Sequence, residues 1–355
     1  MAEFGVYVHI PFCRSRCDYC AFATWTDRGH LVDAYVDAVV TDIRRAVADG
    51  MPAADTVFFG GGTPTLIDPA LIARTIEAIP LSMDAEITVE CNPDDVTPEL
   101  MRTYATAGVN RVSIGVQSMV THVLSVLGRH HDQSNVEIAV ECARSAGIER
   151  INLDLIYGSV GESLDDWSTT VSAALALRPT HVSAYGLTVE AGTPLAEDPA
   201  RHPDDDEQAD KYIAADDLLT GAGLVNYEIS NWALPGHECR HNMVYWDQGN
   251  YRGFGCAAHS HDSGHRWWNV RTPDRYIDLV AAGESVMAAD EHLEPSVREF
   301  ERLELSLRTR RGVPASTLDT ESGVLDGLVE VTDGRAVLTR NGRLLANEIS
   351  TRLNP

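Results

Sequence analysis

The segment VYVHIPFCRSRCDYC, residues 6–20, decides the fold and the chemistry that we predict for this chain. It opens with a short β-branched run, residues 6–10, which predicts a buried strand. Directly after this run, Cys13, Cys17 and Cys20 follow the spacing C-x3-C-x2-C. Three thiols in one loop, within an odd total of seven cysteines, favour a metal site in a reducing compartment over a disulfide framework.

Thiolates are the usual ligands of iron–sulfur clusters, and a cubane usually takes four of them. Because only three cysteines are local, one iron of a [4Fe-4S] cluster would stay open to a small molecule that chelates through amino and carboxylate groups. S-adenosylmethionine is a ligand of that kind. The alternative is a zinc knuckle, which would need a fourth ligand and usually a paired C-x2-C, and neither is obvious nearby.

Working outward from this segment, strand patterns alternate with amphipathic helix patterns, which indicates repeated strand–helix units and a parallel sheet. Six strands are predicted, at residues 6–10, 56–59, 86–91, 111–116, 150–157 and 181–187. The predicted crossover helices span residues 31–48, 70–79, 98–107, 134–146 and 164–177. Right-handed crossovers of this kind predict an α/β fold, a partial, TIM-like (β/α)6 barrel with ligands at the carboxyl ends of the strands.

The pattern changes after residue 227 to a stretch rich in glycine, tryptophan and histidine. The tail then predicts a helix at 296–307, a short helix after Pro314, a hairpin turning at Asp333-Gly334 and a helix at 341–353. This order is typical of a winged-helix-like α+β module, interpreted as a lid or docking surface. We therefore predict a barrel domain over residues 1–230, an extension over 231–290 and a C-terminal domain over 291–355.

The chain of 355 residues has 28 basic and 53 acidic side chains, a net charge of −25. Such a field repels nucleic acid, so no nucleic-acid partner is expected. No stretch approaches the roughly 20 apolar residues that span a bilayer. The amino terminus lacks the pattern of a signal peptide, and a cytoplasmic protein is expected.

A second motif, Gly60-Gly61-Gly62-Thr63-Pro64, follows the second predicted strand. Together with the segment from Tyr7 to Cys20, it resembles the radical S-adenosylmethionine superfamily, in its coproporphyrinogen-oxidase-like branch. The resemblance implies a [4Fe-4S] cluster on Cys13, Cys17 and Cys20. It also implies S-adenosylmethionine contacts from a set of strand-end residues: Tyr7, Tyr19, Gly61, Gly62, Thr63, Glu90, Gln117, Arg129 and Asp154. Within this set, Arg129 would pair with the methionine carboxylate and Asp154 with the ribose hydroxyls.

Two details separate the functional types of this branch. The oxidases have a fourth cysteine two residues after the third, whereas this chain has Phe22 there, as in the haem-chaperone type. The hexapeptide HNMVYW, residues 241–246, matches the H-N-x-x-Y-W signature of the same type. The resemblance thus implies a haem site formed by His241, Asn242, Tyr245 and Trp246. His241 is either an axial ligand or a histidine that orders its loop, and Cys239 and His259 are further ligand candidates.

The leading interpretation is a haem chaperone that binds haem and transfers it to haem-dependent proteins, membrane-associated respiratory enzymes among them. The second is an oxygen-independent coproporphyrinogen III dehydrogenase that decarboxylates two propionates through a 5′-deoxyadenosyl radical. The third is a purely structural iron–sulfur protein, against which the cofactor-pocket residues argue. Whether the chain forms a homodimer stays open.

Overall fold

The computed structural model describes residues 3–320 and 322–354. Its main feature is one twelve-stranded sheet, in the order β12-β11-β10-β9-β1-β2-β3-β4-β5-β6-β8-β7. The six central strands are parallel and confirm the six predicted from the sequence: β1 (Phe4–Ile10), β2 (Ala54–Gly61), β3 (Leu81–Cys91), β4 (Arg111–Gln117), β5 (Arg150–Tyr157) and β6 (His181–Gly186).

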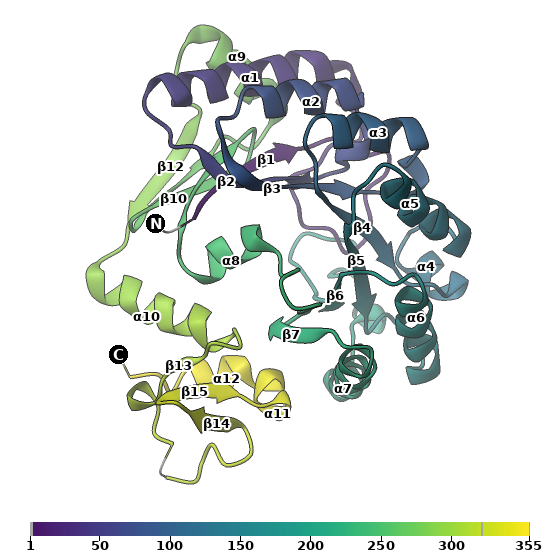
Figure 1. The fold of residues 1–355 in the computed structure, drawn as a ribbon, viewed down its shortest axis with the longest axis vertical. Helices are drawn as coiled ribbons and strands as arrows, with labels where there is room; N and C mark the ends of the chain where they lie inside the picture. Colours follow the sequence, from purple (N-terminus) through teal and green to yellow (C-terminus); the bar gives the residue numbers. More distant parts are fainter. Residues whose placement is uncertain (1–2, 321, 355) are drawn as a thin grey trace.

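Helices cover the outer face of this sheet, as Figure 1 shows for α1 to α3 above the strands and α5 to α7 beside them. They are α1 (Val32–Ala48), α2 (Pro69–Glu77), α3 (Pro98–Thr106), α4 (Thr121–Val126), α5 (Gln133–Ser145), α6 (Leu164–Ala176) and α7 (Asp205–Gly221). Five of them are the predicted crossover helices, and α4 was not predicted. The Asp204 side chain accepts a hydrogen bond from the Glu207 amide and caps the start of α7.

Strand β1 shows why the two faces of the sheet differ. Val6, Val8 and Ile10 alternate into the apolar core under the helices. Tyr7 and His9 point to the opposite side, where they line a cavity. The concave side of the sheet is therefore the side available for ligands.

The sheet continues on both sides of the six parallel strands, which the sequence patterns did not predict. Next to β1 lies β9 (Asn250–Phe254), parallel to it, followed by the antiparallel strands β10 (His259–Asp262), β11 (His265–Asn269) and β12 (Met287–His292). On the other side, β8 (Asn231–Ala233) and β7 (Val225–Glu228) add antiparallel to β6. The residues at 225–292 thus extend the barrel sheet.

The remaining elements lie on the concave side or at the end of the chain. Helix α8 (Arg240–Trp246) lies against the concave side, and α9 (Pro273–Ala282) packs on α1 (Figure 1). A C-terminal module follows, made of α10 (Pro295–Leu307), β13 (Val313–Pro314), β14 (Val329–Thr332), β15 (Arg335–Leu338), α11 (Arg340–Leu344) and α12 (Ala346–Ser350). Within the described residues, no helix is both long and apolar enough to span a membrane.

The C-terminal module has a core of its own, around Leu303, Leu307 and Ile349, and a three-stranded antiparallel sheet. This confirms the predicted α+β module. The prediction of one continuous helix at 341–353 was wrong. Leu345 leaves helical geometry, with φ of −111° and ψ of 22°, so the chain turns between α11 and α12 and Ile349 packs into the core.

Candidate functional site

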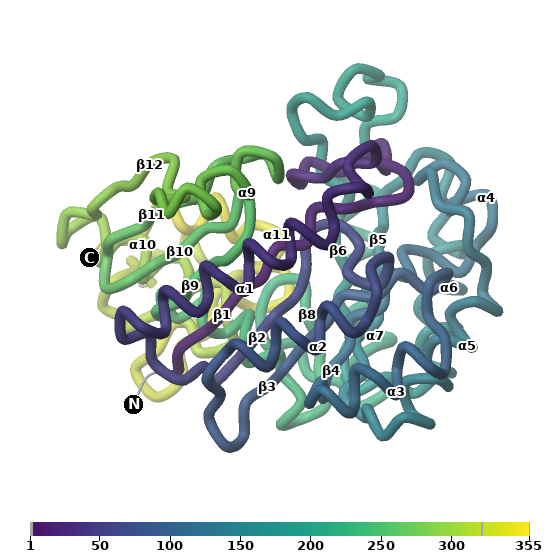
Figure 2. The backbone as a smooth tube through the Cα atoms, turned by 90° about the horizontal axis from the view of Figure 1, so that it is seen from above, coloured from purple at the N-terminus to yellow at the C-terminus, as the bar shows by residue number. Residues whose placement is uncertain are grey.

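The three predicted cluster cysteines lie on a loop, residues 11–25, that leaves the carboxyl end of β1. We call it the cluster loop. The Cys13 amide donates to the Trp25 carbonyl at 3.1 Å and the Trp25 amide to the Pro11 carbonyl at 2.8 Å, which closes the loop at its base. At its far side, Asp18 pairs with Arg201 at 2.9 Å, so the loop lies beside the 187–204 segment (Figure 2).

The three thiols are free and partly exposed. Among the described residues, one group of three side chains has its ligand atoms within 4.8 Å of one another. This group is His265, Asp290 and His292, which lie outside the cluster loop. The loop supplies three thiols, which is one ligand fewer than a zinc knuckle needs and the number that leaves one iron of a cubane open.

The glycine run at the end of β2 is explained by close packing against β1 and the start of the cluster loop. A Cβ atom on Gly62 would lie 2.6 Å from the Ile10 carbonyl oxygen, and one on Gly61, where φ is +104°, would lie 2.3 Å from the His9 ring. The Thr63 hydroxyl donates to the Cys13 sulfur at 3.6 Å. These glycines are thus required by close contacts within the chain, and the ligand contacts implied for Gly61 and Gly62 stay predictions.

Arg129 links the cluster loop to the strand ends. One guanidinium nitrogen donates to the Asn92 side-chain oxygen at 2.6 Å and to the Gly115 carbonyl at 3.1 Å. Another lies 4.0 Å from the Cys17 sulfur. Asn92 was missed by the sequence argument, although it follows the predicted ligand residue at the end of β3. A positive group is thereby held beside the loop that has the thiols.

Two carboxyl groups, on Glu90 and Asp154, face the interior of the barrel from β3 and β5. Asp154 accepts from the Ser113 hydroxyl and the Asn152 amide, both at 2.7 Å, and burial raises its pKa. Glu90 accepts from the Gly61 amide at 3.1 Å, and burial, with the charge of Asp154 second, raises its pKa to about 8. A pair of carboxyl groups in a desolvated site is typical of a ligand-binding position.

The other predicted contact residues lie around the same end of the sheet. The Tyr7 hydroxyl shares a 3.0 Å hydrogen bond with the His9 ring, whose other nitrogen bonds the Ala23 carbonyl at 2.8 Å. Tyr19 packs beside α4, and Gln117 ends β4 with a positive φ of 64°. The structure therefore brings the predicted residues of β1 to β5 to one end of the barrel, and their ligand contacts stay predictions.

His241 lies on α8 and is buried, with both ring nitrogens occupied. They bond the Thr56 and Tyr245 hydroxyls, each at 2.8 Å. Burial, with the charge of Arg111 second, lowers the pKa of His241 to about 3. This arrangement is the one expected of a histidine that orders its segment, which is one of the two interpretations that the sequence left open.

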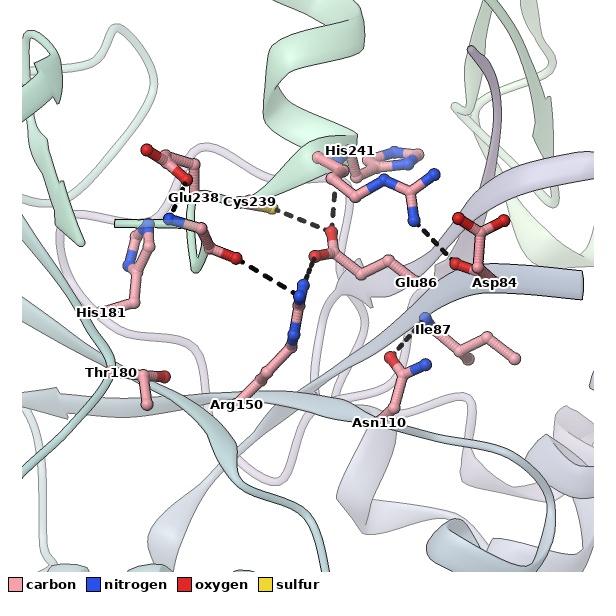
Figure 3. Close-up of polar contacts among 12 residues, drawn as sticks. Asp84, Glu86, Ile87, Asn110, Arg150, Thr180, His181, Glu238, Cys239 and His241 are labelled. Carbon is pink, nitrogen blue, oxygen red and sulfur yellow. Dashed lines mark hydrogen bonds and ion pairs between the residues drawn. The ribbon is translucent and has the colours of Figure 1, made fainter. Parts of the chain in front are cut away.

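The start of α8 is held by a polar network between the helix and the sheet, which Figure 3 draws around Glu86. The Glu86 carboxylate accepts from the Cys239 thiol at 3.8 Å and from the His241 amide at 3.3 Å, and it pairs with Arg150 at 3.2 Å. Burial raises the pKa of Cys239 to about 12, so this sulfur stays a thiol. Both haem-ligand candidates at 239 and 241 are thus used in structural contacts.

Two cavities lie on either side of Tyr245. One, of about 530 Å³, separates the barrel from the C-terminal module, and Asn242, Tyr245 and Trp246 line it. The other, of about 600 Å³, lies between the cluster loop and strands β9 to β11. Its lining includes Phe22, His259, Trp268 and Arg271, of which the sequence argument had weighed only His259 as a ligand. Both volumes lie in the range of roughly 300–1,000 Å³ that is usual for ligand sites.

Comparison with known proteins agrees with this geometry. The family model of the Radical SAM superfamily matches residues 7–174. The protein named "Heme chaperone HemW" of Mycobacterium tuberculosis H37Rv is 40% identical, over 98% of this chain and 93% of that protein. The protein of the same name from Bacillus subtilis 168 is 34% identical over 97% of each. The solved structure of coproporphyrinogen III oxidase (HemN) from Escherichia coli covers 99% of this chain and 89% of that chain, with a TM-score of 0.84 and 23% identity, which shows the shared fold.

Proposed function

The chain belongs to the radical S-adenosylmethionine superfamily and, within it, to the family of the HemW haem chaperones, and from this membership we propose that it binds haem in the cytoplasm and transfers it to haem-dependent proteins. The observation that supports this most is the similarity to curated haem chaperones along nearly the whole chain. Phe22, in place of the fourth cysteine of the oxidases, supports the same choice. The acceptor proteins would include membrane-associated respiratory enzymes.

In this proposal, Cys13, Cys17 and Cys20 hold a [4Fe-4S] cluster. Their C-x3-C-x2-C spacing and their freedom from disulfides support this role. Burial raises the pKa of the Cys13 and Cys20 thiols, and bound iron would favour their thiolate forms. When bound, the cluster and S-adenosylmethionine supply one-electron chemistry.

The strand-end residues would hold S-adenosylmethionine. Arg129, already oriented by Asn92 and Gly115, would bind the methionine carboxylate through its planar guanidinium. Asp154 would accept hydrogen bonds from the ribose hydroxyls, and Glu90 lies near it inside the barrel. These roles need ordered side chains, and each of the three is held by a hydrogen bond within the protein.

The alternative is the dehydrogenase, and one experiment separates the two. The protein is purified without oxygen, its cluster is rebuilt, and haem is titrated by absorbance. Haem-loaded protein is then mixed with apomyoglobin to measure transfer. In parallel, coproporphyrinogen III, S-adenosylmethionine and a reductant are added, and protoporphyrinogen is assayed.

The chaperone proposal predicts stoichiometric haem binding, transfer to apomyoglobin and no protoporphyrinogen. Product formation without haem binding would overturn it in favour of the dehydrogenase. The Cys17→Ala variant tests whether the cluster is needed for either result. Cys142→Ala is its matched control, because Cys142 is a buried cysteine on α5, outside the cluster loop.

A further inference from the structure

The cavity of about 600 Å³ next to the cluster loop has the features that a haem site needs. Strands β9 to β11 form one wall, and residues 21–23 of the cluster loop form the opposite wall. A haem site requires an iron ligand, flat apolar surfaces and cations for the propionates.

An iron ligand needs a nitrogen or sulfur donor atom that is not already bonded within the protein. The lining has two imidazoles and no thiol. His9 is excluded because both of its ring nitrogens are bonded, to Tyr7 and to the Ala23 carbonyl. His259, at the start of β10, makes no side-chain hydrogen bond within the described residues and is exposed to the cavity. Desolvation lowers its pKa, which favours the neutral imidazole that coordinates iron.

Aromatic side chains provide the flat surfaces. Trp268 lies opposite His259 on β11, and the two rings stack at 5.7 Å between centroids. Phe22 projects from the cluster loop with 65% of its surface exposed and lines the cavity on the side opposite the strands. A porphyrin face could pack against this ring.

A cation for the propionates is provided by Arg271. Within the described residues its guanidinium has no ion pair, in a chain whose net charge is −25. In the cavity of about 530 Å³, by contrast, Arg343 is paired with Asp216 at 3.0 Å and Arg308 bonds the Asn347 side chain at 2.9 Å. The lining of this cavity of about 530 Å³ also has no imidazole and no thiol.

From these contacts, and resting on the haem-binding function proposed above, we propose that haem occupies the cavity between the cluster loop and strands β9 to β11, with His259 as an axial ligand and Arg271 as the partner of a propionate. One ring nitrogen of His259 donates its lone pair to the iron, and no redox step is required. The site differs from the one implied by the H-N-x-x-Y-W signature, whose histidine is fully bonded.

Haem titration of the reconstituted protein, followed by absorbance and electron paramagnetic resonance, tests this site. His259→Ala should lower haem affinity by roughly tenfold or more and remove the histidine-ligated spectrum. Added imidazole should restore that spectrum. Arg271→Gln should weaken binding by roughly two- to fivefold and leave the spectrum unchanged. Matched controls are His292→Ala and Arg275→Gln, which change exposed residues outside the cavity and should bind as the native protein does.

The result that overturns this site is a His259→Ala protein with native haem affinity and spectrum. Loss of the histidine-ligated spectrum in His241→Ala, with His259→Ala unaffected, would overturn it in favour of the signature histidine. In both cases the native protein still binds haem, so the proposed function stands. A native protein that binds no haem would instead refute the proposed function itself.

Discussion

The cluster loop and helix α8 have the two most informative motifs of the chain, and they differ in how their polar side chains are used. In the cluster loop, Cys13, Cys17 and Cys20 are partly exposed and free of covalent partners. On α8, His241 has a partner for each ring nitrogen, and the preceding Cys239 donates to a buried carboxylate. A motif residue with free donor atoms is suited to bind a ligand, whereas one with satisfied atoms stabilises the fold.

The largest effect expected from this comparison is on the cluster. Cys17→Ala should abolish the iron–sulfur absorbance of the reconstituted protein, because two thiolates do not hold a cubane stably. Cys13→Ala and Cys20→Ala should do the same. Cys91→Ala and Cys142→Ala should keep the absorbance, since both residues are buried cysteines outside the cluster loop. A cluster that survives Cys17→Ala would contradict the assigned ligands.

The second prediction concerns α8. His241→Ala should lower the free energy of unfolding by about 3–4 kcal/mol, because it removes a buried ring that stacks on Phe58 and leaves the Thr56 and Tyr245 hydroxyls without their partner. The measurement is chemical denaturation of the apo-protein. His292→Ala changes an exposed histidine and should alter stability by less than about 0.5 kcal/mol. Equal stabilities of the two variants would show that His241 does not order its segment.

This contrast also marks what the sequence can predict. The six parallel strands and the cluster loop were predicted because each has a local pattern, a β-branched run or a cysteine spacing. Strands β9 to β12 were not predicted, because their residues are mixed and the parallel pairing of β9 with β1 joins segments more than 240 positions apart. One local signal was available in the dipeptide Ser263-Gly264, because serine and glycine favour turns. In the structure both residues have the positive φ that the tight hairpin turn between β10 and β11 requires.

Contacts between distant segments also decide which of the predicted haem-binding residues are free to bind a ligand. The H-N-x-x-Y-W spacing identified residues 241–246, but a spacing does not show whether the imidazole is already bonded. That depends on Thr56, which lies on β2 and approaches α8 only in the folded chain. The cavity near His259 is likewise invisible in the sequence, because Phe22, Trp268 and Arg271 meet there from two distant segments.

The third prediction concerns a buried carboxyl group that, like His241, is hydrogen-bonded within the protein. Glu228 ends β7, is 2% exposed and accepts from the Ser230 amide at 3.2 Å and from the Asn231 side chain. Burial raises the pKa of Glu228 from 4.5 to about 7. Between these values the unfolded chain has lost the proton that the folded protein keeps, so this group makes stability fall as pH rises from about 4.5 to about 7.

Glu228→Gln should therefore gain stability relative to the native protein by up to about 3 kcal/mol between pH 4.5 and pH 7, and by no more above that range. Denaturation curves at a series of pH values measure the difference. The control is Glu330→Gln, at an exposed position of β14, for which the difference should not depend on pH. If the stability difference between Glu228→Gln and the native protein also did not depend on pH, the Glu228 carboxyl group would not be desolvated in the folded protein.

The smallest expected effect concerns Arg129, which lies beside the cluster loop. Arg129→Ala should weaken the binding of S-adenosylmethionine by about 2 kcal/mol, the usual value of a hydrogen bond to a charged group, while the cluster content stays the same. Arg129→Lys keeps the charge but not the planar pair of donors, so it should recover only part of this loss. Calorimetry on clustered protein measures both. Because Arg129 also bonds Asn92 and Gly115, stability is measured alongside, and a loss of stability with unchanged affinity would place Arg129 among the residues that build the fold.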